Sequence, residues 1–296
     1  MSQLEKKSIA YITLIRLNRP IGIYLLLWPM LWAFWFAAGG FPDLRLLIIF
    51  ILGTVLTRSA GCAINDYADR DIDAHVARSS HRPLATGAIQ PVEALIVFAV
   101  LMLLAFLLVL MTDAFTIKLS FVALFLAVLY PFSKRFTYLP QIFLGAAFAW
   151  AIPMAFAAQT GELTRITWLT FIAALLWAMV YDTIYAMADR QEDLQIGVKS
   201  TAILFGEADI VIVAVIQLMV ISALVLIGTG LERGLYYFSG VAVAVLLFVY
   251  QLYLIRDREP SRCIQAFLNN HYLGMAVFIG VVLDYALHVP APAPVG

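Results

Sequence analysis

Long, uninterrupted apolar stretches dominate this sequence and limit the folds open to it more than any other feature. There are nine, each close to the roughly 20 residues that a helix needs to cross the hydrocarbon core of a bilayer. Apolar residues follow one another directly instead of alternating with polar ones, which excludes the strands of a membrane barrel. We therefore predict nine membrane-spanning helices, at Ile21–Ala38, Leu44–Ile64, Val92–Met111, Phe115–Phe132, Leu139–Ala157, Trp168–Ala186, Ile210–Gly228, Gly234–Ile255 and Tyr272–His288.

Composition and charge agree with a membrane protein. Of all residues, 63% are hydrophobic and 13% are charged, whereas a soluble domain has about 25% charged residues. The 19 basic and 19 acidic residues cancel, so the chain has no basic field that would attract nucleic acid. We predict an all-α membrane protein in which residues 1–296 form a single multi-pass domain, with the helices packed as one bundle.

Lys and Arg fall mainly on one side of the predicted membrane. That side receives 14 of them and the other side receives 3, while Arg58 and Lys118 lie within or at the ends of spans. Basic loops remain in the cytoplasm. We therefore expect a cytoplasmic amino terminus, an external carboxyl terminus and cytoplasmic long loops.

Cysteine and histidine give no sign of a disulfide or a zinc site. Cys62 and Cys263 are both expected on the cytoplasmic side, where structural disulfides are rare. The four histidines show no metal-ligand spacing with either cysteine.

Two acidic clusters stand where the second and sixth spans end. If the helices continue past the membrane, Asp66, Asp69 and Asp73 share one face of the first, at about 100° per residue. Asp182, Asp189 and Asp193 share one face of the second. Both spans cross in the same direction, so we expect the two clusters to meet at the cytoplasmic face.

The density of carboxylates predicts a cation. Six aligned carboxylates at a membrane boundary would repel one another and lose hydration unless cations neutralise them. Hard oxygen donors favour Mg²⁺, which completes its octahedron with water and substrate phosphates. Basic residues follow both clusters, and together with Mg²⁺ they are what a diphosphate leaving group requires; these are Arg70, Arg78, Arg82, Arg190 and Lys199. For each of them a purely topological role stays open.

At these residues the chain resembles a known family, the UbiA-type intramembrane aromatic prenyltransferases. The family's first motif, Asn-Asp-x-x-Asp-x-x-x-Asp, is complete at Asn65, Asp66, Asp69 and Asp73. The second, Asp-x-x-Tyr-Ala-x-x-Asp-x-x-x-Asp, is complete at Asp182, Tyr185, Ala186, Asp189 and Asp193. Other stretches resemble the family's 4-hydroxybenzoate branch; these are Arg16–Gly22, Arg82-Pro83-Leu84 with Gly87, Tyr130–Arg135, Pro140-Gln141 and Gly197–Ser200.

The resemblance implies a fold, a reaction and a set of site residues. The fold is a nine-helix bundle in a bacterial inner membrane, with a central cavity that opens sideways to lipid and an active site at the cytoplasmic face. The reaction transfers a polyprenyl group from a polyprenyl diphosphate to the ring carbon of 4-hydroxybenzoate meta to its carboxyl group, in ubiquinone biosynthesis. The implied catalytic residues are Asp66, Asp69, Asp73, Asp182, Asp189 and Asp193, all except Asp182 being Mg²⁺ ligands, and the implied diphosphate-binding residues are Asn65, Arg70, Arg82 and Lys199.

A carboxylate substrate needs a cation inside a lipid-embedded cavity, because its desolvation is otherwise costly. We expect Arg135 to supply it, together with Lys134 and Tyr130, since a guanidinium binds a carboxylate with two parallel hydrogen bonds. Arg58 lies within the second span and should face a cavity, but its role stays open.

Three alternatives remain at this stage. The acceptor could be another aromatic compound. The acidic motifs could also be ion sites of a divalent-cation or organic-anion transporter, although transport sites usually lie near the membrane midplane. Finally, a membrane pyrophosphatase or lipid-phosphate enzyme would use similar Mg²⁺ chemistry.

Overall fold

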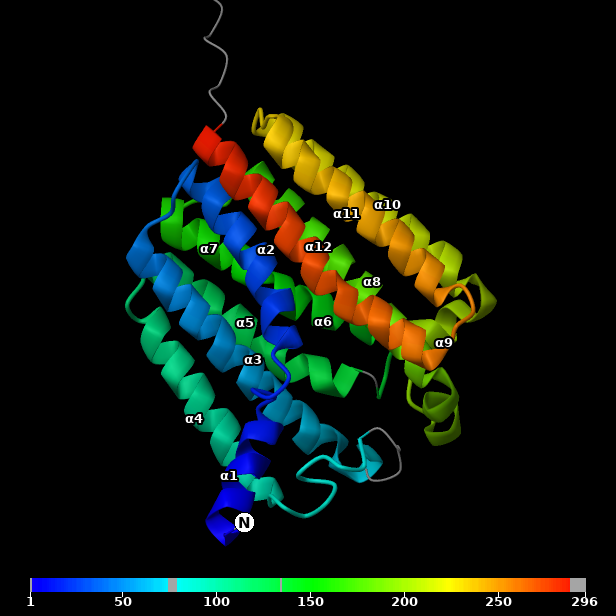
Figure 1. The fold of residues 1–296 in the computed structure, drawn as a ribbon. Helices are drawn as coiled ribbons and strands as arrows, with labels where there is room; N and C mark the ends of the chain where they lie inside the picture. The colour runs from blue at the N-terminus through cyan, green and yellow to red at the C-terminus, as the bar shows by residue number, and fades with distance from the viewer. Residues whose placement is uncertain (1, 74–78, 134, 288–296) are drawn as a thin grey trace, which may run out of the picture.

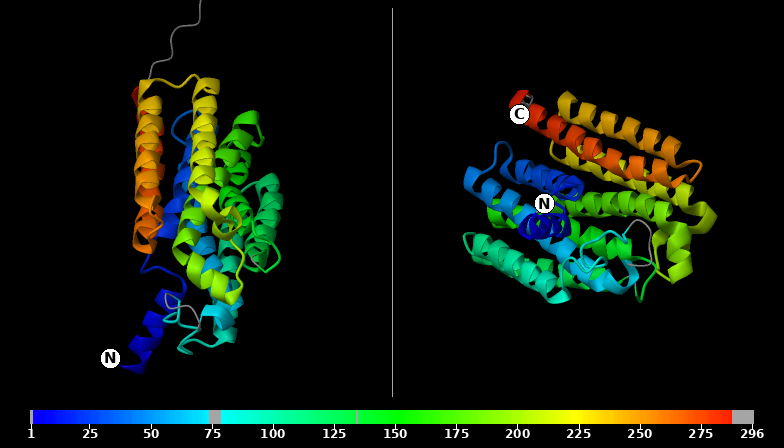
Figure 2. Two further views of the ribbon diagram at one scale, coloured as in Figure 1. Left: turned by 90° about the vertical axis from the view of Figure 1, so that its right-hand side faces the viewer. Right: turned by 60° about the horizontal axis from the view of Figure 1, so that its bottom comes forward.

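The predicted all-α membrane fold is confirmed. The structure is a computed structural model that describes residues 2–73, 79–133 and 135–287, and within them nine helical segments are long and apolar enough to cross a membrane. They pack as a single bundle (Figures 1 and 2). The helices are α1 (Gln3–Leu14), α2 (Ile21–Ala38), α3 (Leu44–Asp73), α4 (Pro91–Val109), α5 (Ala114–Ser133), α6 (Pro140–Ala149), α7 (Ala151–Thr160), α8 (Arg165–Ile196), α9 (Thr201–Phe205), the short 3₁₀ helix η1 (Gly206–Ala208), α10 (Asp209–Gly230), α11 (Leu235–Ile255) and α12 (Pro260–Leu287).

Helices that carry polar residues at the motif end of the bundle extend beyond the predicted spans. The helix α3 continues to Asp73 and α8 to Ile196, so each acidic motif lies on an unbroken helix. Similarly, α12 begins at Pro260 rather than at the predicted Tyr272. Hydropathy locates the apolar run, but backbone hydrogen bonding continues through polar sequence until a stop signal. For α8 that signal is Gly197, whose φ of 72° favours glycine.

The predicted fifth span is two helices in series. The helix α6 ends at Ala149 and α7 begins at Ala151, with Trp150 between them. Pro153 explains the break, because its ring nitrogen has no hydrogen to donate to the carbonyl of Ala149. The pair still counts as one crossing, Pro140–Thr160.

A short helix precedes the first span. Ser2 and Glu5 form a capping box at the start of α1. On its inner face Ala10 and Leu14 are buried in a small cluster with Ala63 of α3. Figure 1 shows α1 at the same end of the bundle as the loop that follows α3. The helix therefore places the chain that follows it beside the first acidic motif.

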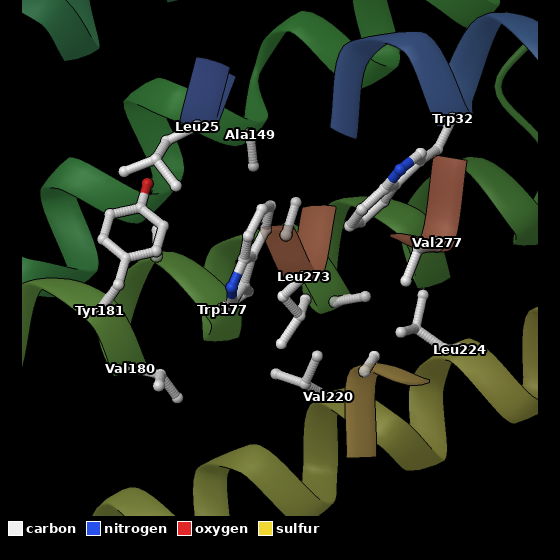
Figure 3. Close-up of a cluster of buried hydrophobic side chains, with 14 of the residues drawn as sticks. Leu25, Trp32, Ala149, Trp177, Val180, Tyr181, Val220, Leu224, Leu273 and Val277 are labelled. Carbon is white, nitrogen blue, oxygen red and sulfur yellow. The ribbon is translucent and has the colours of Figure 1, made fainter. Parts of the chain in front are cut away.

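Tryptophan packing joins α2, α8 and α12 (Figure 3). The rings of Trp32 and Trp177 stack with their centroids 5.4 Å apart. Both indole N–H groups have acceptors on α12: Trp32 donates to the carbonyl of Gly274 at 3.2 Å, and Trp177 donates to Oδ1 of Asn270 at 2.8 Å. A Cβ at Gly274 would overlap the rings of Trp28 and Trp177. This core holds α8 in place, and α8 carries the second motif.

At the opposite end of the bundle, Asp284 is fully buried and caps α11. Its carboxylate accepts hydrogen bonds from the backbone N–H groups of Gly234 at 3.0 Å and Tyr237 at 3.3 Å. We expect Asp284→Ala to destabilise the fold by about 1–3 kcal/mol, because buried donors lose their acceptor. The apparent midpoint of thermal unfolding in detergent should fall, while Glu162→Ala, at an exposed acid, should leave it unchanged. Equal midpoints would contradict the capping role.

Candidate active site

One cavity of about 1020 Å³ runs through the bundle beside both acidic motifs. Its polar end is lined by charged and amide side chains; these are Arg16, Asn18, Arg19, Asn65, Asp66, His81, Arg82 and Asp182. Its other end is apolar, with lining residues from α3, α4 and α5 that include Phe50, Phe106, Val109 and Leu124. The cavity therefore connects a charged site with an apolar channel.

The helix α3 contributes an amide and two buried carboxylates. Asp66 and Asp69 are 1% and 5% exposed. Asn65 donates through Nδ2 to Oδ2 of Asp69 at 3.2 Å, one helical turn away. Asp73 ends the helix, and its side chain lies outside the described residues. Asp66 and Asp69 therefore lie on one unbroken helix that ends at Asp73.

Two arginines meet at Asp66. The Nη2 atom of Arg16 lies 3.0 Å from Oδ1 of Asp66, and Nη1 of Arg82 lies 3.2 Å from the same oxygen. Arg16 comes from the turn after α1, and Arg82 comes from the loop between α3 and α4. The sequence predicted a role for Arg82 but assigned none to Arg16, which is 50 residues away from Asp66 along the chain.

The helix α8 forms the facing wall. Tyr181, Asp182 and Tyr185 line the main cavity, and Tyr130 of α5 lines it with them. Asp189 lines a second, smaller hollow of about 440 Å³, nearer the end of α8. Asp193 lies one turn further on, where its backbone carbonyl accepts from Gly197 and Val198. The structure thus brings Asp182 to the cavity with Asp66 and places Asp189 and Asp193 beyond it.

A buried carboxylate outside the motifs fixes the end of α8. Asp209, fully buried at the start of α10, pairs with Arg190 of α8. It also pairs with Arg258, at 2.9 Å, in the loop before α12. The hydrogen bond that Arg258 donates to Asp209 is the main cause that raises the pKa of Arg258 above its usual value. Arg190 is therefore held by Asp209 and is a structural residue, next to the motif residue Asp189.

Other predicted basic residues lie outside the lining of the main cavity. Arg70 donates to the carbonyl of Tyr67 at 2.9 Å and stacks over that ring. Lys199 lies 5.3 Å from the ring centroid of Tyr138. Arg135 is exposed and donates to the carbonyl of Ala68 at 2.7 Å. Lys134 lies outside the described residues.

Arg58 does line the cavity, as its position within the second span predicts. Its guanidinium lies against Gly22, where a Cβ would overlap it, and 5.8 Å from the ring centroid of Phe148. One Nη atom donates to Sγ of Cys62. The Nε atom is buried and has no hydrogen-bond partner among the described residues. This cation is therefore under-satisfied inside a cavity.

The donors at the polar end fit Mg²⁺. Within the described residues, no three His, Cys, Asp or Glu side chains are gathered as a ready-made metal site. However, Oδ1 of Asn65 is buried and has no hydrogen-bond partner among those residues, while Nδ2 of the same amide donates to the Asp69 carboxylate. Amide and carboxylate oxygens are hard ligands of the kind that Mg²⁺ takes alongside substrate phosphates. Asn65 and Asp69 are therefore the pair best suited to hold it.

Comparison with known proteins gives a family match. A model of the UbiA prenyltransferase family matches residues 26–277. The chain belongs to this family. It is 55% identical over 286 residues to a 4-hydroxybenzoate octaprenyltransferase of Ectopseudomonas mendocina, covering 97% of each chain. It is 56% identical to the protein of that name from Saccharophagus degradans, covering 95% of this chain and 94% of the relative.

Solved family structures share the fold. A UbiA homologue from Aeropyrum pernix, solved in the apo form, superposes with a TM-score of 0.79 at 22% identity, covering 88% of this chain and 97% of the homologue. A homologue from Archaeoglobus fulgidus, solved with GPP and Mg²⁺, gives a TM-score of 0.69 at 20% identity, covering 92% and 99%. The resemblance inferred from the two motifs is thereby confirmed.

Proposed function

We propose that this enzyme transfers a polyprenyl group from a polyprenyl diphosphate to 4-hydroxybenzoate with the help of Mg²⁺. The single observation that carries the proposal is the shape of the main cavity, whose charged end holds Asp66 and Asp182 and whose other end is apolar. Relatives more than half identical over nearly their full length bear the name of this activity. Diphosphate suits the charged end and an isoprenoid suits the apolar one.

The cavity is long enough to hold a prenyl chain. Phe50 and Asp66 both line the cavity and are 16 residues apart on α3, which corresponds to about 24 Å along a helix. Two lining residues of α5 also belong to the outer surface of the bundle: Phe121 is 57% exposed and Leu124 is 39% exposed. We infer that a lipid-soluble substrate enters sideways from the bilayer through this part of the wall.

The diphosphate belongs at the polar end. Mg²⁺ held by Asn65 and Asp69, with Asp189 and Asp193 from the second motif and Asp73 from the first, would neutralise the charge that develops on the leaving group. The guanidinium groups of Arg16 and Arg82 already lie there. Arg70 and Lys199 stay in the proposal as outer contacts that attract the diphosphate.

The proposed reaction breaks one bond and forms another. The allylic C–O bond breaks with its electron pair going to diphosphate, the ring carbon ortho to the hydroxyl forms the new C–C bond, and the ring loses a proton. Tyr130, Tyr181 and Tyr185 line the same region, where an aromatic face stabilises a desolvated cation by about 2 kcal/mol. Asp182, also in the lining, is the carboxylate that we propose as proton acceptor.

The acceptor carboxylate needs a cation within the cavity. Arg16 and Arg82 already pair with Asp66, whereas Arg58 keeps a buried Nε without a partner among the described residues. We propose that Arg58 receives the carboxylate of 4-hydroxybenzoate, beside Tyr130. The sequence-based proposal for Arg135 stays a prediction.

The distribution of basic residues supports one orientation in the membrane. We propose that the protein lies in the bacterial inner membrane with its amino terminus and the acidic motifs on the cytoplasmic side and its carboxyl terminus outside. The excess of Lys and Arg at the motif end supports this orientation.

Membranes containing the protein, incubated with radiolabelled prenyl diphosphate and candidate aromatic acceptors, test the function. We expect label in prenylated 4-hydroxybenzoate, no label after chelation of Mg²⁺, and little label in homogentisate or a naphthoate. Release of inorganic phosphate from diphosphate without transfer would indicate a pyrophosphatase. Uptake of ions or acids without chemical change would indicate a transporter.

A further inference from the structure

Asp66 is a buried carboxylate at the polar end of the cavity that is paired with two cations. Its side chain is 2% exposed, and Oδ1 lies 3.0 Å from Nη2 of Arg16 and 3.2 Å from Nη1 of Arg82. The second oxygen, Oδ2, lies 3.3 Å from the same nitrogen of Arg16. Both guanidinium groups are themselves mostly buried, at 22% and 17% exposed. One carboxylate thus holds two largely desolvated cations.

Arg16 stands in the turn that closes α1, and its side chain contacts Asp66 from there. Its φ of 58° is a left-handed conformation that non-glycine residues rarely adopt. Arg16 is the left-handed residue of a Schellman motif, in which the N–H of Leu17 donates to the carbonyl of Ile12 and the N–H of Arg16 donates to the carbonyl of Thr13. The guanidinium itself contacts the Asp66 carboxylate and the carbonyl of Thr13, which accepts from Nη1 of Arg16 at 3.2 Å. These contacts leave other N–H donors of the guanidinium for a ligand.

We propose that Asp66 is a positioning residue, which holds Arg16 and Arg82 as a clamp for the diphosphate, and that it does not bind Mg²⁺; the proposal rests on the function proposed above. Asp66, Arg16 and Arg82 carry a net charge of +1 together. A metal ion at Asp66 would approach two fixed cations, whereas a diphosphate is attracted to them. Two guanidinium groups already occupy the Asp66 carboxylate, so the lone pairs that face them are not available to a metal ion.

The affinity for inorganic pyrophosphate in metal-free, EDTA-containing buffer distinguishes a metal-binding role of Asp66 from a positioning role. The two roles predict opposite changes of this affinity in Asp66→Asn. If Asp66 is only a metal ligand, Asp66→Asn removes a negative charge and should strengthen pyrophosphate binding. If Asp66 positions the two arginines, the same change should weaken binding by about tenfold, which corresponds to about 1.4 kcal/mol. Isothermal titration calorimetry on the full chain in detergent measures this affinity.

Asp69→Asn is the matched control, one turn further along α3. It should leave metal-free pyrophosphate binding unchanged or stronger, and it should weaken Mn²⁺ binding observed by electron paramagnetic resonance. Arg16→Ala should reproduce the loss caused by Asp66→Asn, and the double variant should lose little more than either single variant. Arg16→Lys should recover only part of the affinity, because a lysine offers one point charge.

Unchanged or stronger pyrophosphate binding by Asp66→Asn, with the wild type binding normally, would overturn the positioning role alone. A wild type that binds no pyrophosphate would instead overturn the diphosphate site and with it the proposed function. If Asp66→Asn does not fold, Arg16→Ala still tests the proposal. Full pyrophosphate affinity in Arg16→Ala would exclude a diphosphate clamp that includes Arg16.

Discussion

Asp69→Asn and Asp189→Asn should each lower the turnover of prenyl transfer by on the order of 10²-fold or more, because each removes a charge that stabilises the leaving diphosphate in the transition state. The two residues come from different helices, α3 and α8, and neither replacement changes the size of the side chain. Initial rates at saturating concentrations of both substrates measure the loss. Raising the Mg²⁺ concentration should recover part of it, since the lost group is a metal ligand.

Two further replacements show whether the loss is specific to the motif faces. Asp257→Asn, at an exposed acid between α11 and α12 whose side chain is 60% exposed, should leave turnover unchanged. Asp71→Asn changes an acid that helical spacing places away from the shared face, so its effect should be far smaller. Near-normal turnover by both Asp69→Asn and Asp189→Asn would overturn the assignment of Mg²⁺ to the two motifs.

The fold was predictable because a bilayer imposes one simple length requirement. The first predicted span, Ile21–Ala38, coincides with α2, and every other predicted span overlaps an observed membrane-spanning segment. The predicted helix boundaries are wrong where they do not depend on hydropathy. It does not reveal that α12 starts at Pro260, in polar sequence, or that Pro153 divides the fifth span at Trp150. A search for spans also misses the short helix α1, because it has only 12 residues and some of them are charged.

The site was predictable in part. Asn65, Asp66 and Asp182 stand in motifs with regular helical spacing, and the structure places all three in one cavity lining. The partners of Asp66 could not be found in this way, because Arg16 and Arg82 approach it through turns and through contacts remote in sequence. The pairing of Arg190 with Asp209 was equally hidden. Spacing reveals a shared face of a helix, but only the packed structure reveals what lies opposite.

Arg58→Ala should raise the KM for 4-hydroxybenzoate by an amount equivalent to about 2–5 kcal/mol, the usual cost of leaving a buried charge unpaired. The KM for prenyl diphosphate and the turnover at saturating acceptor should change little. Arg58→Lys should recover part of the loss, because it restores the charge but not the two parallel hydrogen bonds. An acceptor that lacks the carboxylate, such as phenol, should distinguish little between the wild type and Arg58→Ala.

Arg135→Ala is the decisive comparison, because the sequence alone favours Arg135 for the same task. Its guanidinium is bonded to the carbonyl of Ala68, directly before Asp69 on α3. Loss of that contact should disturb the first motif, so turnover should fall with similar effects on both substrates. A selective rise in the KM for 4-hydroxybenzoate in Arg135→Ala, with Arg58→Ala unaffected, would return the carboxylate to Arg135. The kinetic constants distinguish the roles of the two arginines. Loss of acceptor recognition raises the KM for 4-hydroxybenzoate, whereas loss of support for the metal motif lowers turnover.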